Sequence, residues 1–214
     1  MKEILYIHGL GGGRDGRFAT VLRKNLGDDY KIIAPEIPVQ PREAMAFVQG
    51  ALFNHDYDLV VASSLGAYYL MYCMHLPKKL LINPAVKAGE YIEKYVGKGV
   101  HEYNTPRLFG PKEYVIDDKF ISDLKEMEFD LDDEELLVTR CMVSPEDELF
   151  GEQNVDMCIK KFLDENVTII HSSHRVEEDV IINDIIPKIK EFIEEDFSLS
   201  PIVIGPWVDF DDDE

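Results

Sequence analysis

Short apolar runs alternate with longer amphipathic stretches along most of this 214-residue chain. Helix-like stretches lie at about 14–26, 41–55, 65–76, 151–165 and 179–196. The regular succession of strand, helix and strand predicts βαβ units, and therefore an α/β domain with a mostly parallel, doubly wound sheet and helices on both faces. Six runs rich in Ile, Leu and Val are typical of its buried strands: "EILYIHG", "YKIIAPEIP", "DLVVASS", "KKLLINPAV", "ELLVTRCMV" and "NVTIIHSS".

One stretch departs from this alternation. Between about Asn83 and Asp133 the chain mixes aromatics, glycines, prolines and charges, and it shows no clear strand pattern. A connection of this length commonly forms a lid or a substrate wall, so we expect a lid-like excursion over one end of the sheet at about 84–133. Because one core suffices for a chain of this length, we expect a single domain over residues 1–200.

The last residues, "PWVDFDDDE", are strongly acidic. We therefore expect residues 201–214 to form a solvated acidic C-terminal tail. A calcium site is the weaker interpretation, because the glycine and the spaced ligands of an EF-hand loop are missing.

Composition limits the classes of function. The formal net charge is −20, and a field of that sign repels nucleic-acid phosphates and anionic lipid, so we expect neither nucleic acid nor membrane as a partner. The start "MKEILYIHG" runs directly into a strand pattern without the apolar core of a signal peptide, which predicts a cytoplasmic protein. Cys73, Cys141 and Cys158 are odd in number and isolated, which argues against disulfides and metal sites and favours buried thiols.

The stretch "VVASSLGA" joins a predicted strand to a predicted helix with almost no loop. A turn this sharp forces one residue into a strained backbone conformation and crowds the positions two before and two after it. Centring the turn on Ser64 puts Ala62 and Gly66 at the crowded positions, which matches the nucleophile elbow G-x-S-x-G with alanine for the first glycine. Centring it on Ser63 would put much larger side chains there. The alternative is that the two serines only cap the helix.

A serine hydroxyl becomes nucleophilic beside a base, so the elbow predicts a histidine and an orienting acid later in the chain. Where this elbow occurs, the order along the chain is serine, acid, histidine. Asp147 follows the strand pattern "ELLVTRCMV", and His174 follows "NVTIIHSS". Both therefore fall just past strand ends, where sites gather in parallel sheets. Glu146 and Glu148 flank the aspartate and are alternatives for the acid, or the cluster is a solvated turn.

Two further histidines need an interpretation. His171 and His174 are separated by two residues, which could suggest a metal pair, but no cysteine or third ligand lies near them in the sequence and we expect no metal. His8 ends the first strand pattern, and we expect it to shape the following loop rather than to act as a base.

That loop, "GLGGGRDG", is rich in glycine. A tetrahedral acyl intermediate needs main-chain N–H donors for its oxyanion, one from the residue after the nucleophile and one from an early strand-to-helix loop. Leu65 and Leu10 are the expected donors of this oxyanion hole. Gly9 is expected to bind substrate, because a glycine lets the backbone come close to a ligand.

The same loop allows a rival interpretation. Residues 11–16 satisfy G-x-G-x-x-G, and Glu36 follows twenty residues after the last of these glycines, as in a dinucleotide-binding Rossmann-type protein. However, three residues separate this pattern from the strand end, whereas the dinucleotide motif starts directly there. It also leaves Ser64, Asp147 and His174 without a role.

Together these residues carry a resemblance to a known family. The chain is similar to the YqiA/YcfP-like esterases, which are small bacterial α/β-hydrolases, over roughly residues 3–195. The stretches that carry the similarity are "LYIHG", "SSLGAYYL", "LINPAVKAGEYIEKYVG", "EYVIDDKFISDLKEME", "SPEDEL" and "SSH".

The resemblance implies an α/β-hydrolase fold, serine esterase activity on acyl esters, and a triad of Ser64, Asp147 and His174. Three departures stand out. Family members have glycine at the position of Ala62, a polar loop in place of "LGGGRDG", and Asn-His-Ala-Phe-like text in place of "SSHRV".

The sequence thus favours a serine hydrolase that cleaves small-molecule carboxylic esters through an acyl-enzyme intermediate, without metal or cofactor. Tyr68 and aromatic residues of the excursion are the expected lining of the acyl pocket, whereas Tyr69 and Tyr72 are expected in the core. The alternative from another class is a binding protein that keeps this fold but turns over no substrate.

Overall fold

The computed structural model of the protein describes residues 1–73, 77–128, 131 and 133–196. Within them, six strands form a parallel sheet in the order β2-β1-β3-β4-β7-β8. Each of the six apolar runs contributes one strand, which confirms the predicted parallel sheet. The expected acidic tail, 201–214, lies outside the described residues. The strands are β1 (Lys2–Ile7), β2 (Tyr30–Ile33), β3 (Leu59–Ser63), β4 (Lys79–Ile82), β7 (Thr139–Val143) and β8 (Val167–Ile169).

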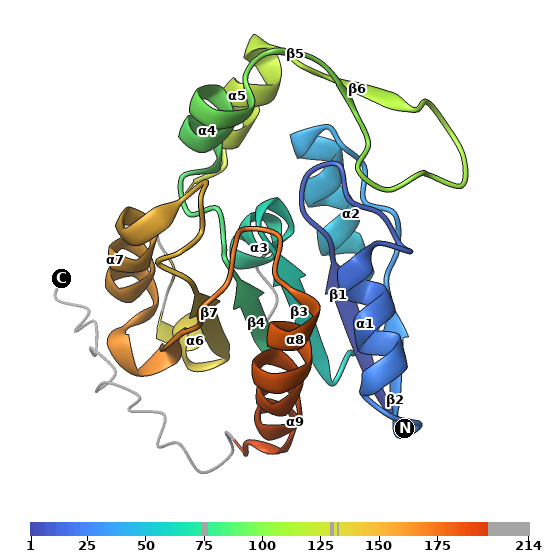
Figure 1. Ribbon diagram of the computed structural model, residues 1–214, viewed down its shortest axis with the longest axis vertical. Helices are drawn as coiled ribbons and strands as arrows, with labels where there is room; N and C mark the ends of the chain where they lie inside the picture. Colours follow the sequence, from blue (N-terminus) through green and yellow to red (C-terminus); the bar gives the residue numbers. More distant parts are fainter. Residues whose placement is uncertain (74–76, 129–130, 132, 197–214) are drawn as a thin grey trace, which may run out of the picture.

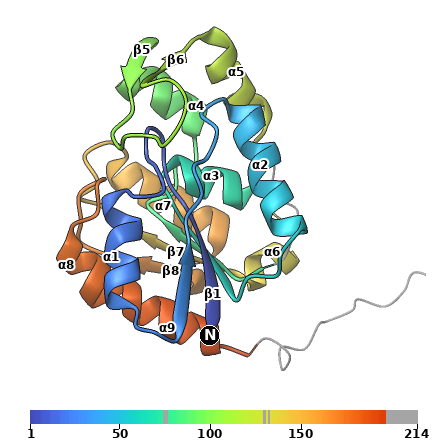
Figure 2. The ribbon, with the colours of Figure 1, turned by 90° about the vertical axis from the view of Figure 1, so that its right-hand side faces the viewer.

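Helices cover both faces of this sheet (Figures 1 and 2). The helices of one face are α1 (Arg17–Asn25), α8 (Glu178–Val180), the π-helical turn η3 (Ile181–Ile185) and α9 (Ile186–Glu194). Those of the other face are α2 (Pro41–Phe53), α3 (Leu65–Met71) and α7 (Gly151–Phe162). A short 3-10 turn, η2 (Asp164–Asn166), leads from α7 into β8.

Alternate residues of the central strands enter two separate cores. In β1, Leu5 and Ile7 pack with the α2, α3 and α7 side, while Ile4 and Tyr6 pack with the α1 and α9 side. This follows from the two-residue repeat of a strand, and burial on both faces is the reason that the runs are continuously apolar. Sandwiched in this way, the strands hold their carboxyl ends in fixed positions at one edge.

The excursion between β4 and β7 lies beyond that edge and contains the helices α4 and α5 (Figure 1). It also contains an antiparallel hairpin of β5 and β6, so the absence of a strand pattern was misleading. Both strands are only four residues long. Most of β5 is exposed and β6 alternates exposed with buried residues, so neither forms a continuous apolar run. The elements are α4 (Ala88–Tyr91), the π-helical turn η1 (Ile92–Val96), β5 (Gly99–Glu102), β6 (Glu113–Ile116) and α5 (Asp118–Glu126). The short helix α6 (Asp133–Leu137) follows the excursion and lies at the opposite edge of the sheet, where it leads into β7 (Figure 1).

The run "ELLVTRCMV" is shorter as a strand than predicted. Its first residues belong to α6, and β7 begins only at Thr139. The carboxyl end of β7 is unaffected, so Asp147 still follows a strand end, as predicted.

All three cysteines, Cys73, Cys141 and Cys158, are buried and free of disulfides. None of the helices in the described part of the chain combines the length and the apolar character needed to cross a bilayer.

Candidate active site

Ser64 occupies the turn between β3 and α3. Its φ of 53° and ψ of −122° lie outside the regions that side-chain-bearing residues normally adopt. Strain of this kind persists only where the surrounding structure enforces it, and it is the backbone geometry of a nucleophile elbow. The Ser64 side chain makes no capping hydrogen bond to α3, which disfavours the simple helix-cap interpretation.

The neighbours of Ser64 are small because the first turn of α3 lies against the backbone of β1. A Cβ atom on Gly66 would lie 2.5 Å from the carbonyl oxygens of Ile7 and His8. A Cβ atom on Gly9 would lie 3.0 Å from Cβ of Ser64. Ala62 is fully buried, so its single methyl group fits where the related motif has glycine.

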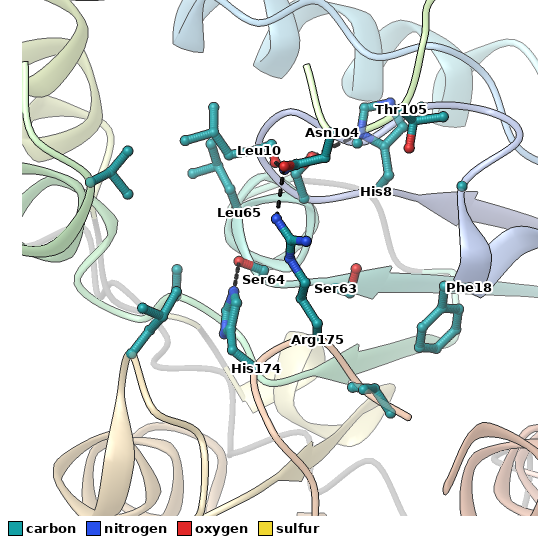
Figure 3. Close-up of a pocket in the computed structure, with 18 of the residues that line it drawn as sticks. His8, Leu10, Phe18, Ser63, Ser64, Leu65, Asn104, Thr105, His174 and Arg175 are labelled. Carbon is teal, nitrogen blue, oxygen red and sulfur yellow. Dashed lines mark hydrogen bonds between the residues drawn. The ribbon is translucent and has the colours of Figure 1, made fainter. Parts of the chain in front are cut away.

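His174 lies beside Ser64, although 110 residues separate them in the chain (Figure 3). The Ser64 Oγ atom is 3.0 Å from Nε2 of His174. On the other side of the ring, Nδ1 is 2.8 Å from Oδ2 of Asp147. Because a carboxylate accepts, Nδ1 carries the proton and Nε2 is left to accept from the serine hydroxyl. The Phe150 ring meets the imidazole edge to face, with centroids 4.6 Å apart.

Asp147, rather than a flanking glutamate, faces the imidazole. Its side chain is buried, and its second oxygen, Oδ1, accepts from the main-chain N–H groups of Leu149 and Phe150 at 2.9 and 3.0 Å. Glu146 points elsewhere and accepts from Nδ1 of His171 at 2.8 Å. The alternatives for the acid are thereby separated, since only one of the three carboxylates contacts the ring.

The loop that carries His174 is held at several points. Glu148 accepts from the main-chain N–H of His174 at 2.7 Å. Glu177 accepts from the Ser172 hydroxyl at 2.7 Å, and hydrogen bonds from Ser173 and Ser172 lower its pKa to about 2. These contacts fix the main chain on either side of the imidazole.

His8 shapes the glycine-rich loop, in line with expectation. Its Nε2 accepts from the main-chain N–H of Ile37 at 3.1 Å, so its Nδ1 carries the proton and donates to the carbonyl of Gly9 at 2.9 Å. Burial of the ring lowers the pKa of His8 to about 4. A neutral imidazole whose two ring nitrogens are both hydrogen-bonded to the main chain is suited to holding the loop rather than to transferring protons.

A cavity of about 630 Å³ opens above Ser64 and His174, a size typical of small-molecule sites. Gly9, Leu10 and Leu65 all line it, and Leu10 and Leu65 both lie above Ser64 in the view of Figure 3. The excursion forms much of the opposite wall. Its aromatic contribution is Tyr91, Tyr95 and Tyr114.

Tyr68 does not line this cavity, so its expected role in substrate binding was wrong. Its side chain is fully buried, and its hydroxyl donates to the main-chain carbonyl of Leu124 in α5. At helical spacing it projects from the side of α3 that faces the excursion, not from the end that faces the cavity. Tyr69 and Tyr72 are buried in the same core, as predicted.

Two cavity residues were not evident from the sequence. Arg175 directly follows His174, and its Nη2 donates to Oδ1 of Asn104 at 2.7 Å (Figure 3). An arginine beside a candidate catalytic histidine in so acidic a chain was a usable signal. Asn104 carried no signal, because only the folding of the β5–β6 hairpin brings it to the cavity.

The geometry disfavours the rival interpretations. Glu36 is the acid that a dinucleotide site would need, but it is already paired within the protein. Its Oε2 atom lies 3.6 Å from Nε of Arg107, and its Oε1 atom accepts from the main-chain N–H of Leu108. His171 and His174 each pair with a different carboxylate. Across the residues that the structure describes, no three His, Cys, Asp or Glu side chains gather as metal ligands would.

Comparison with known proteins identifies the family. Residues 3–194 match the model of the "Uncharacterised protein family (UPF0227)", to which YqiA and YcfP belong. The chain belongs to this family. The UPF0227 match includes residues of all six strands of the sheet and each of the three residues Ser64, Asp147 and His174, which confirms the resemblance seen in the sequence. No curated protein matches the sequence of this chain.

Solved structures establish the fold of this UPF0227 member as that of the α/β-hydrolases. Est1E from Butyrivibrio proteoclasticus, solved with ferulic acid bound, has a TM-score of 0.67 and 10% sequence identity over 91% of this chain and 90% of its own. Mouse alpha/beta hydrolase domain-containing protein 10 has a TM-score of 0.63 and 17% identity, covering 89% of each chain. The esterase domain of a Rhodothermus marinus protein has a TM-score of 0.55 and 12% identity over 90% and 88%.

Proposed function

We propose that the protein is a serine hydrolase that cleaves carboxylic esters through an acyl-enzyme intermediate. The observation that carries this proposal is the continuous contact from Ser64 Oγ to His174 Nε2 at 3.0 Å and from His174 Nδ1 to Asp147 Oδ2 at 2.8 Å. Each group is within hydrogen-bond reach of the next, which is the geometric requirement for an activated serine. The strained elbow holds the hydroxyl at the cavity floor.

In the proposed first step, Ser64 Oγ attacks the carbonyl carbon of the ester while its proton moves to Nε2 of His174. Asp147 holds the ring in the tautomer that can accept this proton and stabilises the imidazolium that forms. The carbonyl π electrons move to the oxygen, giving a tetrahedral oxyanion. When the oxyanion collapses, the bond to the alcohol oxygen breaks, and the alcohol leaves with the proton from Nε2.

Main-chain N–H groups of Leu65 and Leu10 are the proposed donors to the oxyanion. Leu65 is the first residue of α3, so its N–H has no partner within the helix. Leu10 follows Gly9, which lies against Ser64, and both Leu10 and Leu65 line the cavity. In the second step a water molecule gives a proton to Nε2 of His174 and attacks the acyl carbon. The bond from the acyl carbon to Ser64 Oγ then breaks, Oγ takes the proton back from Nε2, and the acid leaves.

The structural neighbours support an ester as substrate. Est1E was solved with ferulic acid, a carboxylic acid, and the Rhodothermus marinus domain is described as an esterase. Aromatic side chains and the glycine-rich loop line the cavity, and such uncharged surfaces suit the acyl part of an ester.

Labelling with a fluorophosphonate probe tests the proposal directly, because the probe modifies only an activated serine. We expect labelling at Ser64 and hydrolysis of a 2-nitrophenyl butanoate. Ser64→Ala should abolish labelling and lower kcat by about 10⁶. Ser63→Ala is the matched control, because the Ser63 hydroxyl contacts Tyr6 rather than His174. Unlabelled Ser64 together with no hydrolysis would instead favour a binding protein that lacks turnover.

A further inference from the structure

The arginines of the protein divide into two groups. Five of the seven form ion pairs: Arg14 and Arg23 with Asp15, Arg42 with Asp123, Arg107 with Glu36, and Arg140 with Glu195. The other two, Arg17 and Arg175, form no ion pair with any residue that the structure describes. Both of these line the cavity above Ser64.

Arg175 lies across the cavity from the His174 loop toward the hairpin (Figure 3). Its side chain is exposed, and the hydrogen-bond partner of its Nη2 is the neutral amide oxygen of Asn104. Arg17 stands beside the same loop, and its Nη2 donates to the carbonyl oxygens of Arg175 and Val176 at 2.6 and 2.7 Å. Neutral oxygens satisfy these donors without neutralising either charge.

Unpaired cations at this position are unusual for this chain. It carries 42 acidic and 22 basic residues, yet its cavity is lined by two arginines and a single acid, Glu102. Glu102 lies on β5, and it forms no ion pair with either arginine. A guanidinium presents several N–H donors in a planar fork that suits carboxylate or phosphate oxygens. Among the residues that line the cavity, basic side chains therefore outnumber acidic ones, in a protein whose overall charge is strongly negative.

We propose that Arg175, with Arg17 behind it, binds an anionic group, a carboxylate or a phosphate, on the alcohol part of the ester. This group is distinct from the oxyanion of the tetrahedral intermediate. The inference rests on the proposed function and names its substrate class: esters whose leaving group bears a carboxylate or a phosphate. The alcohol side follows from the chemistry of the loop. His174 returns its proton to the leaving oxygen, so the alcohol must lie against His174, and Arg175 is the next residue.

Matched activated esters test the assignment. The anionic substrates are 4-butanoyloxy-3-nitrobenzoate and 4-butanoyloxy-3-nitrophenyl phosphate, and the neutral one is 2-nitrophenyl butanoate. A fourth substrate, the 2-nitrophenyl monoester of adipic acid, moves the carboxylate to the acyl side. The two leaving-group anions distinguish carboxylate from phosphate as the preferred anionic group.

We expect Arg175→Gln to lower kcat/KM for the leaving-group anions by about 10- to 100-fold, the range of a charge-assisted hydrogen bond, and to change the neutral ester by less than about threefold. Arg175→Lys should restore part of the loss, because the charge returns without the fork. Asn104→Asp should also lower the preference for leaving-group anions over the neutral ester, since it gives Arg175 a carboxylate partner. Arg14→Gln removes the same charge from a residue that does not line the cavity and should leave the preference unchanged.

Binding of the reaction product 4-hydroxy-3-nitrobenzoate provides a readout that needs no turnover. We expect Arg175→Gln to raise its Kd, measured by calorimetry, about tenfold or more. Equal losses for neutral and anionic esters, or an unchanged product Kd, would overturn the subsite while leaving the esterase proposal intact. A dependence on Arg175 confined to the adipate ester would overturn its alcohol-side position. If Ser64 resists the probe yet product binding depends on Arg175, the proposed esterase function fails and the anion site stands.

Discussion

The main-chain N–H of His174 donates to the carboxylate of Glu148 at 2.7 Å. Glu148 follows Asp147 directly, so the β7 loop holds the histidine in two ways, by its ring through Asp147 and by its backbone through Glu148. The two contacts together set both the position and the tilt of the imidazole relative to Ser64.

Removing the Glu148 carboxylate should therefore slow the reaction without removing any group that contacts substrate. For Glu148→Ala we expect kcat on an activated ester to fall about tenfold with KM nearly unchanged, because the ring is held less accurately. Glu148→Gln should recover most of the rate, since its amide oxygen still accepts. A thermal melt of each variant separates loss of position from loss of fold. The expectation fails if alanine and glutamine are equally slow.

Asp147→Asn should be much more damaging. Oδ1 of this residue accepts from two main-chain N–H groups, so an asparagine would keep its oxygen there and turn its NH₂ group toward Nδ1 of His174. The imidazole would then carry its proton on Nε2 and could not accept from Ser64.

We expect kcat to fall about 10⁴-fold, as in other triads. Glu146→Gln is the control, because Glu146 pairs with His171, and it should retain nearly full activity. Comparable rates for the two variants would show that Asp147 does not set the tautomer.

Gly66 tests the steric origin of the elbow. A methyl group at this position would meet two carbonyl oxygens of β1 and the following residue at 2.5 Å, and backbone cannot yield as a flexible side chain does. We expect Gly66→Ala to lower the free energy of unfolding by about 1–3 kcal/mol.

Gly50 provides the matched comparison, because it lies within α2 and a Cβ atom added there would meet no neighbouring side chain or strand within 4 Å. Gly50→Ala should raise the free energy of unfolding by about 0.5–1 kcal/mol through the helix preference of alanine. Urea unfolding measures both, and a shift of the same sign in the two variants would contradict the steric argument.

His8 should make the protein sensitive to mild acid. Burial lowers the pKa of His8 from 6.5 to about 4 in the folded state. Between pH 6.5 and pH 4, His8 is therefore protonated in the unfolded chain but neutral in the folded protein. The contribution of the neutral ring to the free energy of unfolding is fully present above pH 6.5. As the pH falls to about 4, the free energy of unfolding decreases by up to about 3 kcal/mol. Below pH 4 both states are protonated and the decline ends.

A series of urea titrations from pH 7 to pH 4, on the wild type and on His8→Gln, measures this contribution. The difference in pH dependence between the two proteins isolates the titration of His8. Parallel pH profiles would rule out the linkage, because the variant cannot titrate at this position.

Local patterns along the chain were sufficient to predict the sheet, both helix layers and the elbow. Continuous apolar runs report burial on two faces, and small residues around Ser64 report a crowded turn, so these features depend on near neighbours alone. Failures occurred where near neighbours were uninformative. The strands β5 and β6 are only four residues long and neither is a continuous buried run. The side of α3 on which Tyr68 lies depends on how α5 packs against it.

The order of residues by itself determined that a serine, an acid and a histidine would each follow a strand of one parallel sheet, because covalent sequence sets strand order and strand ends. Only the tertiary structure decided which of three adjacent carboxylates faces the imidazole, and that Asn104 and Arg175 meet across the cavity. Those choices depend on the twist of the sheet and the docking of the excursion. They arise from contacts between residues far apart in the chain, which no local pattern encodes.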